Sequence, residues 1–330
     1  MKRAILICAV ACGHHDDKAK PAPAPAPVKK DVPVIPGSTV LYDDGLTPMT
    51  PRLVGDTLVF ADQSCCLKSE PVAGGEPTTL VKRTQITDYA IADKQLVYVG
   101  LAENAEQLSV RGVTLAGADG MKPQSLPKEI EVAHVVVAGN DVYVAGMTNA
   151  GAMLVHSTLD GATPAVTPVN AVSPSLVSDG TRAFIIFGQE LHALTGGTVG
   201  PSLGKLPDAQ NFTYAIDGDW LYYATDHAIQ RAALTPFKID AWSIPIDEAA
   251  LPVAAGHGRV AWAEGHKLYV SSGTSKSLLT TTTANEYTGL AIGKDAVYYA
   301  TAFLYGENAK TIDERRATQR PGVVASTPLK

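Results

Sequence analysis

The sequence predicts an all-β protein built from one repeated unit of short antiparallel strands. The unit consists of a polar turn, an alternating aromatic and aliphatic run, a polar break and a second strand-like run, and its clearest copy begins DGDWLYYATD at residue 217. Copies recur roughly every 40 residues along the chain. Gly, Pro, Thr and Val interrupt the windows in which an amphipathic helix could form, which argues against helical repeats of similar period.

The period of the repeat predicts the architecture. The aromatic residues of the alternating runs fall at steps of 38, 45, 41, 38, 40 and 36 residues, at Phe60, Tyr98, Tyr143, Phe184, Tyr222, Trp262 and Tyr298. A unit of this length with about four short strands is typical of a β-propeller blade. We therefore expect seven blades in residues 37–330, and the irregular 45-residue step leaves six or eight blades open.

The pattern within each unit predicts the order of its strands. A short, almost wholly apolar run precedes each turn, and we expect it to be the innermost strand, buried on both faces between neighbouring blades. The alternating run that follows is expected to be the second strand. Residues 38–42 precede the first full copy and are expected to complete the last blade, which would close the ring and remove exposed sheet edges.

Charge and motif content exclude several functions. Lys and Arg number 27 against 33 Asp and Glu, for a net charge of −6, and no basic stripe is present, so nucleic acid is not an expected partner. The chain has no HExxH, P-loop, CxxC or Rossmann GxGxxG motif. We therefore expect no catalytic residues, no cofactor and no resident metal.

The N-terminus has the features of an export signal. Lys2 and Arg3 precede a run of eight mostly apolar residues, 4–11, which is too short to span a bilayer as a helix. Small residues then lead to Cys12, and this arrangement resembles the bacterial lipoprotein signal. The resemblance implies that residues 1–11 are removed and that Cys12 is lipidated, which would anchor the chain stably. A secretory signal cleaved near Ala11 or Gly13 is the alternative.

A spacer follows the cysteine. Residues 12–36 are rich in Ala, Pro and Lys, with alternating prolines from residue 21 to 27, a composition that favours extended polyproline II geometry over a packed core. We expect lipid, stalk and propeller in that order, with membrane contact through the lipid alone and a monomeric propeller in the periplasm or at the cell surface. In the lipoprotein family, Gly13 in place of Asp favours the outer membrane.

Several residues depart from the repeat. Cys65 and Cys66 are adjacent in a chain expected to be exported, where disulfides are favoured. A vicinal disulfide, two buried thiols, a soft-metal ligand pair and a bridge to another protein all remain open. Trp242 is expected to pack under a neighbouring blade, with an exposed contact as the alternative, and residues 305–321 are expected to extend the last blade.

Acidic and aromatic residues are predicted to share one face of the propeller. They fall near the connections between blades or the turns between second and third strands, and a face of this kind would attract a cationic peptide or a basic protein surface. The predicted binding face comprises Asp62, Asp88, Tyr89, Glu103, Asp226, His227, Glu264, Glu286 and Tyr287.

The repeats also resemble those of a known group. Their Asp-Gly turns, Tyr-Tyr pairs and Gly-Gly turns, such as Gly74-Gly75, are similar to those of the Tol-type and YVTN-type bacterial β-propellers over residues 38–330. Members of that group mostly act as binding platforms in the cell envelope, which implies a non-catalytic platform for a protein or peptide. Two alternatives remain: a metal-dependent hydrolase or lyase using acidic residues and His227 or His266 at the channel mouth, and a structural envelope component.

Overall fold

The structure is a computed structural model, and it describes residues 35–45, 48–62, 65–93, 95–171, 173–282, 286–302 and 322–329. The chain divides into two compact units, Met1–Asp31 and Val32–Lys330, and every described residue lies in the second. The predicted signal peptide, Cys12, nearly all of the predicted stalk and the tail 305–321 lie outside the described residues. No helix in the described ranges is long and apolar enough to cross a membrane.

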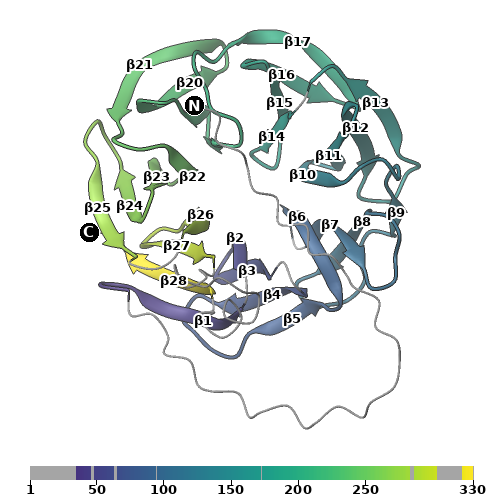
Figure 1. Cartoon of the computed structure of the whole chain (residues 1–330), viewed down its shortest axis with the longest axis horizontal. Coiled ribbons are helices and arrows are strands. Elements are labelled where there is room, and N and C mark those ends of the chain that lie inside the picture. Colours follow the sequence, from purple (N-terminus) through teal and green to yellow (C-terminus); the bar gives the residue numbers. More distant parts are fainter. Residues whose placement is uncertain are drawn as a thin grey trace, which may run out of the picture. The chain divides into compact units, whose positions relative to one another are not determined.

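The second unit is a seven-bladed β-propeller, as the repeat predicted (Figure 1). Each blade is a four-stranded antiparallel sheet. Blades 1 to 3, from the inner to the outer strand, are β2 (Pro48–Val54), β3 (Thr57–Asp62), β4 (Cys66–Pro71) and β5 (Thr78–Val81); β6 (Thr84–Ala92), β7 (Gln95–Ala102), β8 (Ser109–Thr114) and β9 (Gln124–Ser125); and β10 (Val132–Ala138), β11 (Asp141–Thr148), β12 (Gly151–Thr158) and β13 (Ala165–Val169).

The remaining blades follow the same order around the ring. Blades 4 to 7 are β14 (Ser175–Ser178), β15 (Ala183–Phe187), β16 (Glu190–Thr195) and β17 (Thr198–Lys205); β18 (Tyr214–Asp217), β19 (Trp220–Ala224), β20 (Ala228–Leu234) and β21 (Phe237–Pro245); β22 (Ala250–Gly256), β23 (Arg259–Glu264), β24 (Lys267–Ser271) and β25 (Ser277–Thr281); and β26 (Tyr287–Ile292), β27 (Ala296–Thr301), β28 (Gly322–Pro328) and β1 (Thr39–Gly45).

The ring is closed by pairing the start of the propeller with its end. Strand β1 is the outer strand of blade 7 and pairs antiparallel with β28, with Thr39 opposite Ser326. This confirms the expectation for residues 38–42. Ile35, just before β1, is 5% exposed and packs among the apolar residues between blades 6 and 7. The packed domain therefore includes residues before position 37.

The apolar run of each unit is the inner strand, as predicted, but it is less completely buried than expected, and in blades 1 to 6 the second strand is buried more. In β3 and β23 every residue after the first is buried, whereas the inner strands β18 and β22 are mostly half-buried. A second strand has a strand on each edge and a neighbouring blade against each face. An inner strand has one edge without a strand, facing the centre of the ring, so its side chains keep more contact with solvent.

Apolar side chains fill the junctions between blades. Among the described residues one cluster lies at each of the seven junctions, and the cluster between blades 1 and 2 joins Val59 and Leu67 to Tyr89 and Leu96. Six of the seven repeat aromatics are buried in these second strands, and Tyr298 is half-buried. Burial of one such side chain contributes about 1.5–3 kcal/mol, so the repeated aromatic is a main source of stability.

The strand order assigns the loops to two faces. The connections between blades and the turns between second and third strands lie at one end of every sheet, which we call the connection face. The turns between first and second strands and between third and fourth strands lie at the other end, the opposite face. Gly218 in the turn between β18 and β19 has a φ of +58° with nothing near its Cβ position, so the turn geometry alone requires the glycine.

Candidate functional site

Four residues of the predicted binding face are buried and cannot form an accessible surface. Asp62, Tyr89, Glu264 and Tyr287 are 3%, 0%, 3% and 6% exposed. They lie at strand ends or within strands, not in the loops. Asp62 and Glu264 were placed on the face because an acidic residue at the end of a strand has the same sequence pattern as one in the adjoining turn. Tyr89 and Tyr287 belong to the inner strands β6 and β26 and not to the loops before them.

The contacts of two of these residues show a structural role. The hydroxyl of Tyr89 on blade 2 donates to the carbonyl of Val59 on blade 1 at 2.8 Å. Glu264 accepts from the Trp262 indole at 2.8 Å and from the Lys276 ammonium at 3.1 Å. Removing either residue would break the packing between or within blades, which is a different effect from the loss of a binding surface.

The other predicted residues remain accessible. Glu103, Asp226, His227 and Glu286 are exposed on the connection face, and Asp88 is half-buried on the inner strand β6. Glu103 forms an exposed ion pair with Arg83 at 3.5 Å, a kind of contact that contributes at most about 1 kcal/mol. Asp226 accepts from the amide of Gln210 at 2.8 Å.

Acidic residues occur on both faces of the propeller. In the described loops of the connection face they are Glu103, Glu106, Glu129, Glu131, Asp208, Asp226, Asp247, Glu248 and Glu286. In those of the opposite face they are Asp56, Glu76, Asp93, Asp119, Asp160, Asp179, Asp219 and Asp295. Charge alone therefore does not distinguish the connection face, and a further feature is needed to select it.

That feature is a group of interacting side chains, three on inner strands and one in a loop of the connection face, which we call the channel arc: Arg52, Asp88, His134 and Phe212. Asp88 on β6 reaches from blade 2 towards both neighbours. Its carboxylate lies 3.5 Å from Nδ1 of His134 on blade 3 and 4.0 Å from the guanidinium of Arg52 on blade 1. It also accepts from the backbone N–H of Val135 at 3.0 Å, so it links three successive blades.

The electrostatics of the arc favour its charged form. Burial alone would raise the pKa of Asp88, but the hydrogen bond and charge of His134, the charge of Arg52 and the Val135 N–H together lower it below its usual value. Burial alone would lower the pKa of His134, and the hydrogen bond and charge of Asp88 raise it above its usual value. These contacts favour the carboxylate form of Asp88 and the protonated form of His134.

Phe212 completes the arc from blade 5. It lies in the connection between β17 and β18, and its ring centroid is 5.1 Å from that of His134, two blades away. Its backbone has a φ of +62°, which is unusual for a bulky side chain, and its N–H donates to Ser175 Oγ of the intervening blade at 3.1 Å. Strain of this kind persists only where the surroundings impose it, and it concentrates at functional sites.

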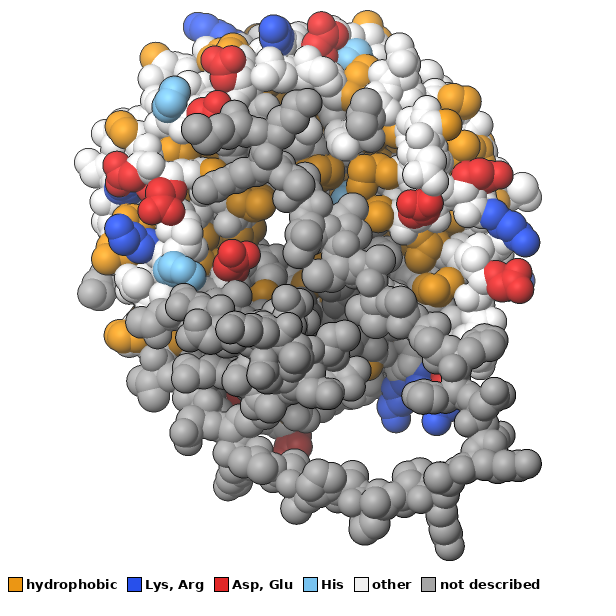
Figure 2. Space-filling view, in the orientation of Figure 1, with side chains coloured by type: hydrophobic (Ala, Val, Ile, Leu, Met, Phe, Trp, Pro, Cys, Tyr) orange, Lys and Arg blue, Asp and Glu red, His pale blue; other side chains and the backbone are white. Residues whose placement is uncertain are grey.

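The connection face also has exposed apolar surface. Leu251, the second residue of the inner strand β22, is 55% exposed at the end next to the connection face. On the face seen in Figure 2, hydrophobic side chains gather beside the central opening, and acidic side chains are scattered around the ring. Arg52 and His134 were missed by the sequence reasoning. Each is a polar residue within the run of its inner strand, and this departure from an apolar pattern could have identified both in the sequence.

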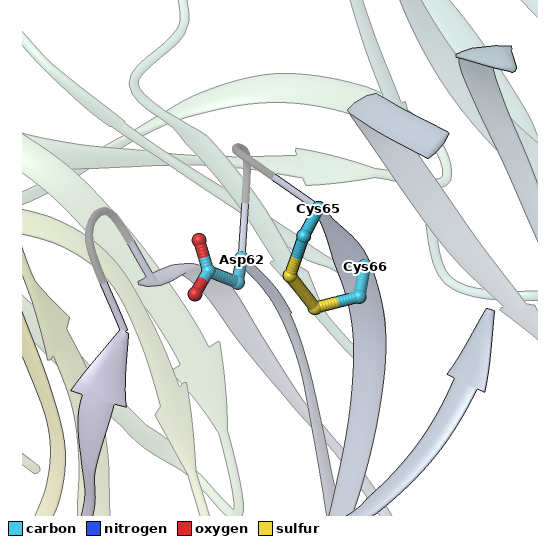
Figure 3. A group of neighbouring side chains, drawn as sticks. All are labelled: Asp62, Cys65 and Cys66. Atoms are coloured by element: carbon cyan, nitrogen blue, oxygen red, sulfur yellow. A yellow bond between two sulfur atoms is a disulfide. The ribbon is translucent and has the colours of Figure 1, made fainter. Parts of the chain in front are cut away.

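A second group of chemically distinctive side chains lies at the turn between β3 and β4. Cys65 and Cys66 form a disulfide in the structure, with Sγ atoms 1.98 Å apart, and the Asp62 carboxylate lies beside the sulfur atoms (Figure 3). One ligand atom from each of these three residues lies within 4.8 Å of the others. It is the one potential metal-ligand group found within the described part of the chain, and neither His227 nor His266 belongs to it.

Trp242 packs against a neighbouring blade, as expected. Its indole N–H donates to the carbonyl of Gly273 on blade 6 at 2.9 Å, and its ring meets that of Tyr222 edge-on at 5.6 Å. The Arg231 guanidinium lies 5.1 Å from the same ring. The large apolar residues of β21 are therefore explained by packing.

Comparison with known proteins supports the fold and leaves the function open. No family model and no curated protein matches the sequence. Solved structures that are similar include BamB from Moraxella catarrhalis (12% identity, covering 89% of this chain and 100% of that one, TM-score 0.57). Others are the WD40 domain of Pan2 from Neurospora crassa (9%, 86% and 90%, 0.60) and BBS1N in complex with ARL6DN (15%, 90% and 98%, 0.56). At these identities the likeness establishes the class of protein, a β-propeller, and nothing finer.

Proposed function

We propose that this protein is a non-catalytic binding platform of the bacterial cell envelope, and that its propeller holds a protein or peptide partner at the connection face. The observation that carries the proposal is the channel arc, which joins charged and aromatic side chains from several blades. A centre of charged and aromatic side chains surrounded by exposed polar loops matches the usual anatomy of an interface with an anchoring core and a solvated rim.

The strained backbone of Phe212 supports the same surface. The Phe212 ring contacts the His134 ring at a centroid distance of 5.1 Å, and the backbone conformation that places it there costs of order 1–3 kcal/mol. Arginine and aromatic side chains are enriched among residues that dominate binding energy. The exposed acids of the surrounding loops would favour encounter with a partner whose facing surface is basic at its edge. A similar propeller, BBS1N, was solved in complex with ARL6DN.

The choice of face can be tested by comparing two charge-reversal variants. The first carries Glu103→Lys, Asp226→Lys and Glu286→Lys on the connection face, and the second carries Asp56→Lys, Glu76→Lys and Asp295→Lys on the opposite face. All six residues are exposed, so both variants should fold, and they change the net charge equally. In affinity capture from solubilised envelope, the connection-face variant should no longer retain the partner, and the opposite-face variant should retain it like the native chain. Equal capture by both variants, or equal loss, would contradict the proposed face.

Anchoring by lipid is part of the proposal and has its own test. The lipoprotein-type signal before Cys12 supports attachment through that residue, with the outer membrane favoured by Gly13. A Cys12→Ser chain should fail to incorporate labelled fatty acid, and in detergent phase separation it should partition into the aqueous phase. A Cys8→Ser chain should be labelled and should partition like the unaltered protein. Labelling of the Cys12→Ser chain would place the lipid elsewhere.

A further inference from the structure

The turn between β3 and β4 of blade 1 brings together three ligand atoms of two chemical types. Asp62 offers a carboxylate oxygen, and Cys65 and Cys66 offer sulfur, all within 4.8 Å of one another (Figure 3). Thiolates favour thiophilic cations such as Zn²⁺ and its heavier analogue Cd²⁺, and Zn²⁺ sites with three protein ligands keep a fourth position for solvent. The donor set is therefore suitable for a thiophilic divalent cation once the two sulfurs are free to coordinate.

The backbone holds this turn without help from the sulfur atoms. Asp62 ends β3 opposite Cys66, which begins β4, and the N–H of Cys65 donates to the Asp62 carbonyl at 3.0 Å. The N–H of Thr84, from blade 2, donates to the Cys65 carbonyl at 3.1 Å. These bonds involve main-chain atoms alone, so opening the disulfide leaves them in place and keeps the three ligands near one another.

The three residues differ in their exposure to solvent. Asp62 and Cys66 are buried, whereas Cys65 is half-buried and reachable from solvent. Anionic ligands in a buried position bind a cation strongly because water screens the attraction weakly there. The exposed side of Cys65 offers a route for a reductant and for the incoming ion.

We propose that reduction of the Cys65–Cys66 disulfide converts this turn into a binding site for one thiophilic divalent cation, with Asp62 as third ligand. A dithiol reductant transfers two electrons and two protons to the disulfide, which yields two cysteine thiols and the oxidised reductant. The cation then displaces the two thiol protons. Two thiolates, one carboxylate and a divalent ion sum to the same net charge of −1 as the oxidised site with its single carboxylate, so loading adds no net buried charge.

Cadmium titration of the purified full chain tests the proposal, because cadmium–thiolate bonds absorb in the ultraviolet. After reduction with a phosphine and its removal, the chain should bind one Cd²⁺ more than a Cys65→Ser, Cys66→Ser chain treated identically. Before reduction the two chains should bind equally. The double variant keeps Cys8 and Cys12, so the difference reports the vicinal pair alone. No difference after reduction would overturn the proposal.

The Asp62→Asn variant tests the third ligand. The amide has nearly the same shape but lacks the charge, so the affinity of the reduced chain for Cd²⁺ should fall roughly tenfold or more, since even indirect partners of metal ligands cost 10–100-fold. Thermal unfolding of the oxidised variant provides the control for folding. Unchanged affinity in a variant that melts like the original chain would show that the carboxylate is not a ligand and would refute the site as stated.

Discussion

Glu70 on β4 gives the sharpest test of the energetics of this fold. Its side chain is 1% exposed, and neither carboxylate oxygen has a hydrogen-bond partner among the described residues. The nearby Lys68, two residues along the same strand, donates instead to the Tyr42 hydroxyl at 2.7 Å. Burial raises the pKa of Glu70 from 4.5 to about 7. The folded protein therefore binds the Glu70 proton more tightly than the unfolded chain does.

The sign and size of the effect follow from this shift. A carboxyl whose pKa is raised on folding contributes full stability below its unfolded pKa and loses that stability as the pH rises through its folded pKa. A difference of about 2.5 pKa units corresponds to about 3.4 kcal/mol in total, of which about 2.5 kcal/mol falls between pH 5 and pH 8. The free energy of unfolding should decrease by that amount over this range because of Glu70 alone.

Urea unfolding of the native chain and of a Glu70→Gln variant between about pH 5 and pH 8 measures this contribution. The variant cannot ionise, so it should be nearly as stable as the native chain at pH 5 and more stable by about 2 kcal/mol at pH 8. A Glu76→Gln variant, changed at an exposed acid of the same blade, should follow the native curve. A difference between native and Glu70→Gln chains that stays flat across the range would refute the assignment of a buried, protonated carboxyl.

Three further perturbations test other parts of the structure. Because Asp88 raises the pKa of His134, the stability advantage of the native chain over a His134→Gln variant should shrink in urea unfolding as the pH rises above about 6.5; an advantage that grows would contradict the pairing. Gly289→Ala should lower the free energy of unfolding by about 1–3 kcal/mol, because its Cβ would overlap the backbone of Thr50 on the adjacent blade; unchanged thermal stability would contradict this packing. Phe212→Gly should relieve its left-handed backbone, and the greater conformational freedom of glycine in the unfolded chain should offset most of that gain, so the free energy of unfolding should change by less than about 1 kcal/mol while partner capture is lost; full capture would show that the ring is not part of the proposed surface.

The fold was predictable because its main determinant is repeated. Each blade needs a large aromatic on its second strand to fill a junction, and seven copies of that requirement are visible as a period in the chain. The burial of individual strands was harder to predict. An apolar inner run and an alternating second run suggested that the inner strand is the more buried, yet burial depends on how many neighbours a strand has, which the local pattern does not contain.

The site was less predictable than the fold because its residues come together through the packing of successive blades. Arg52, Asp88 and His134 are separated by 36 and 46 positions in the chain, and their side chains meet because successive inner strands stand side by side. Asp62 and Glu264 showed the reverse problem. Each ends a second strand, where one further residue would have placed it in a solvent-exposed turn, and a pattern of hydrophobic periodicity does not locate a strand end that closely.

The two distinctive groups of side chains differ in how they relate to the repeat, and this difference bears on function. The channel arc occupies inner-strand positions that every blade has, filled by charged or aromatic residues in blades 1, 2 and 3 and reached by Phe212 from blade 5. The Asp62, Cys65 and Cys66 group occupies a single turn, and no other turn between second and third strands contains cysteine. Because the arc draws on several blades, changes there should alter binding of a large partner. Because the cysteine group depends on one turn fixed by main-chain bonds, it can respond to reduction while the other six blades keep their packing.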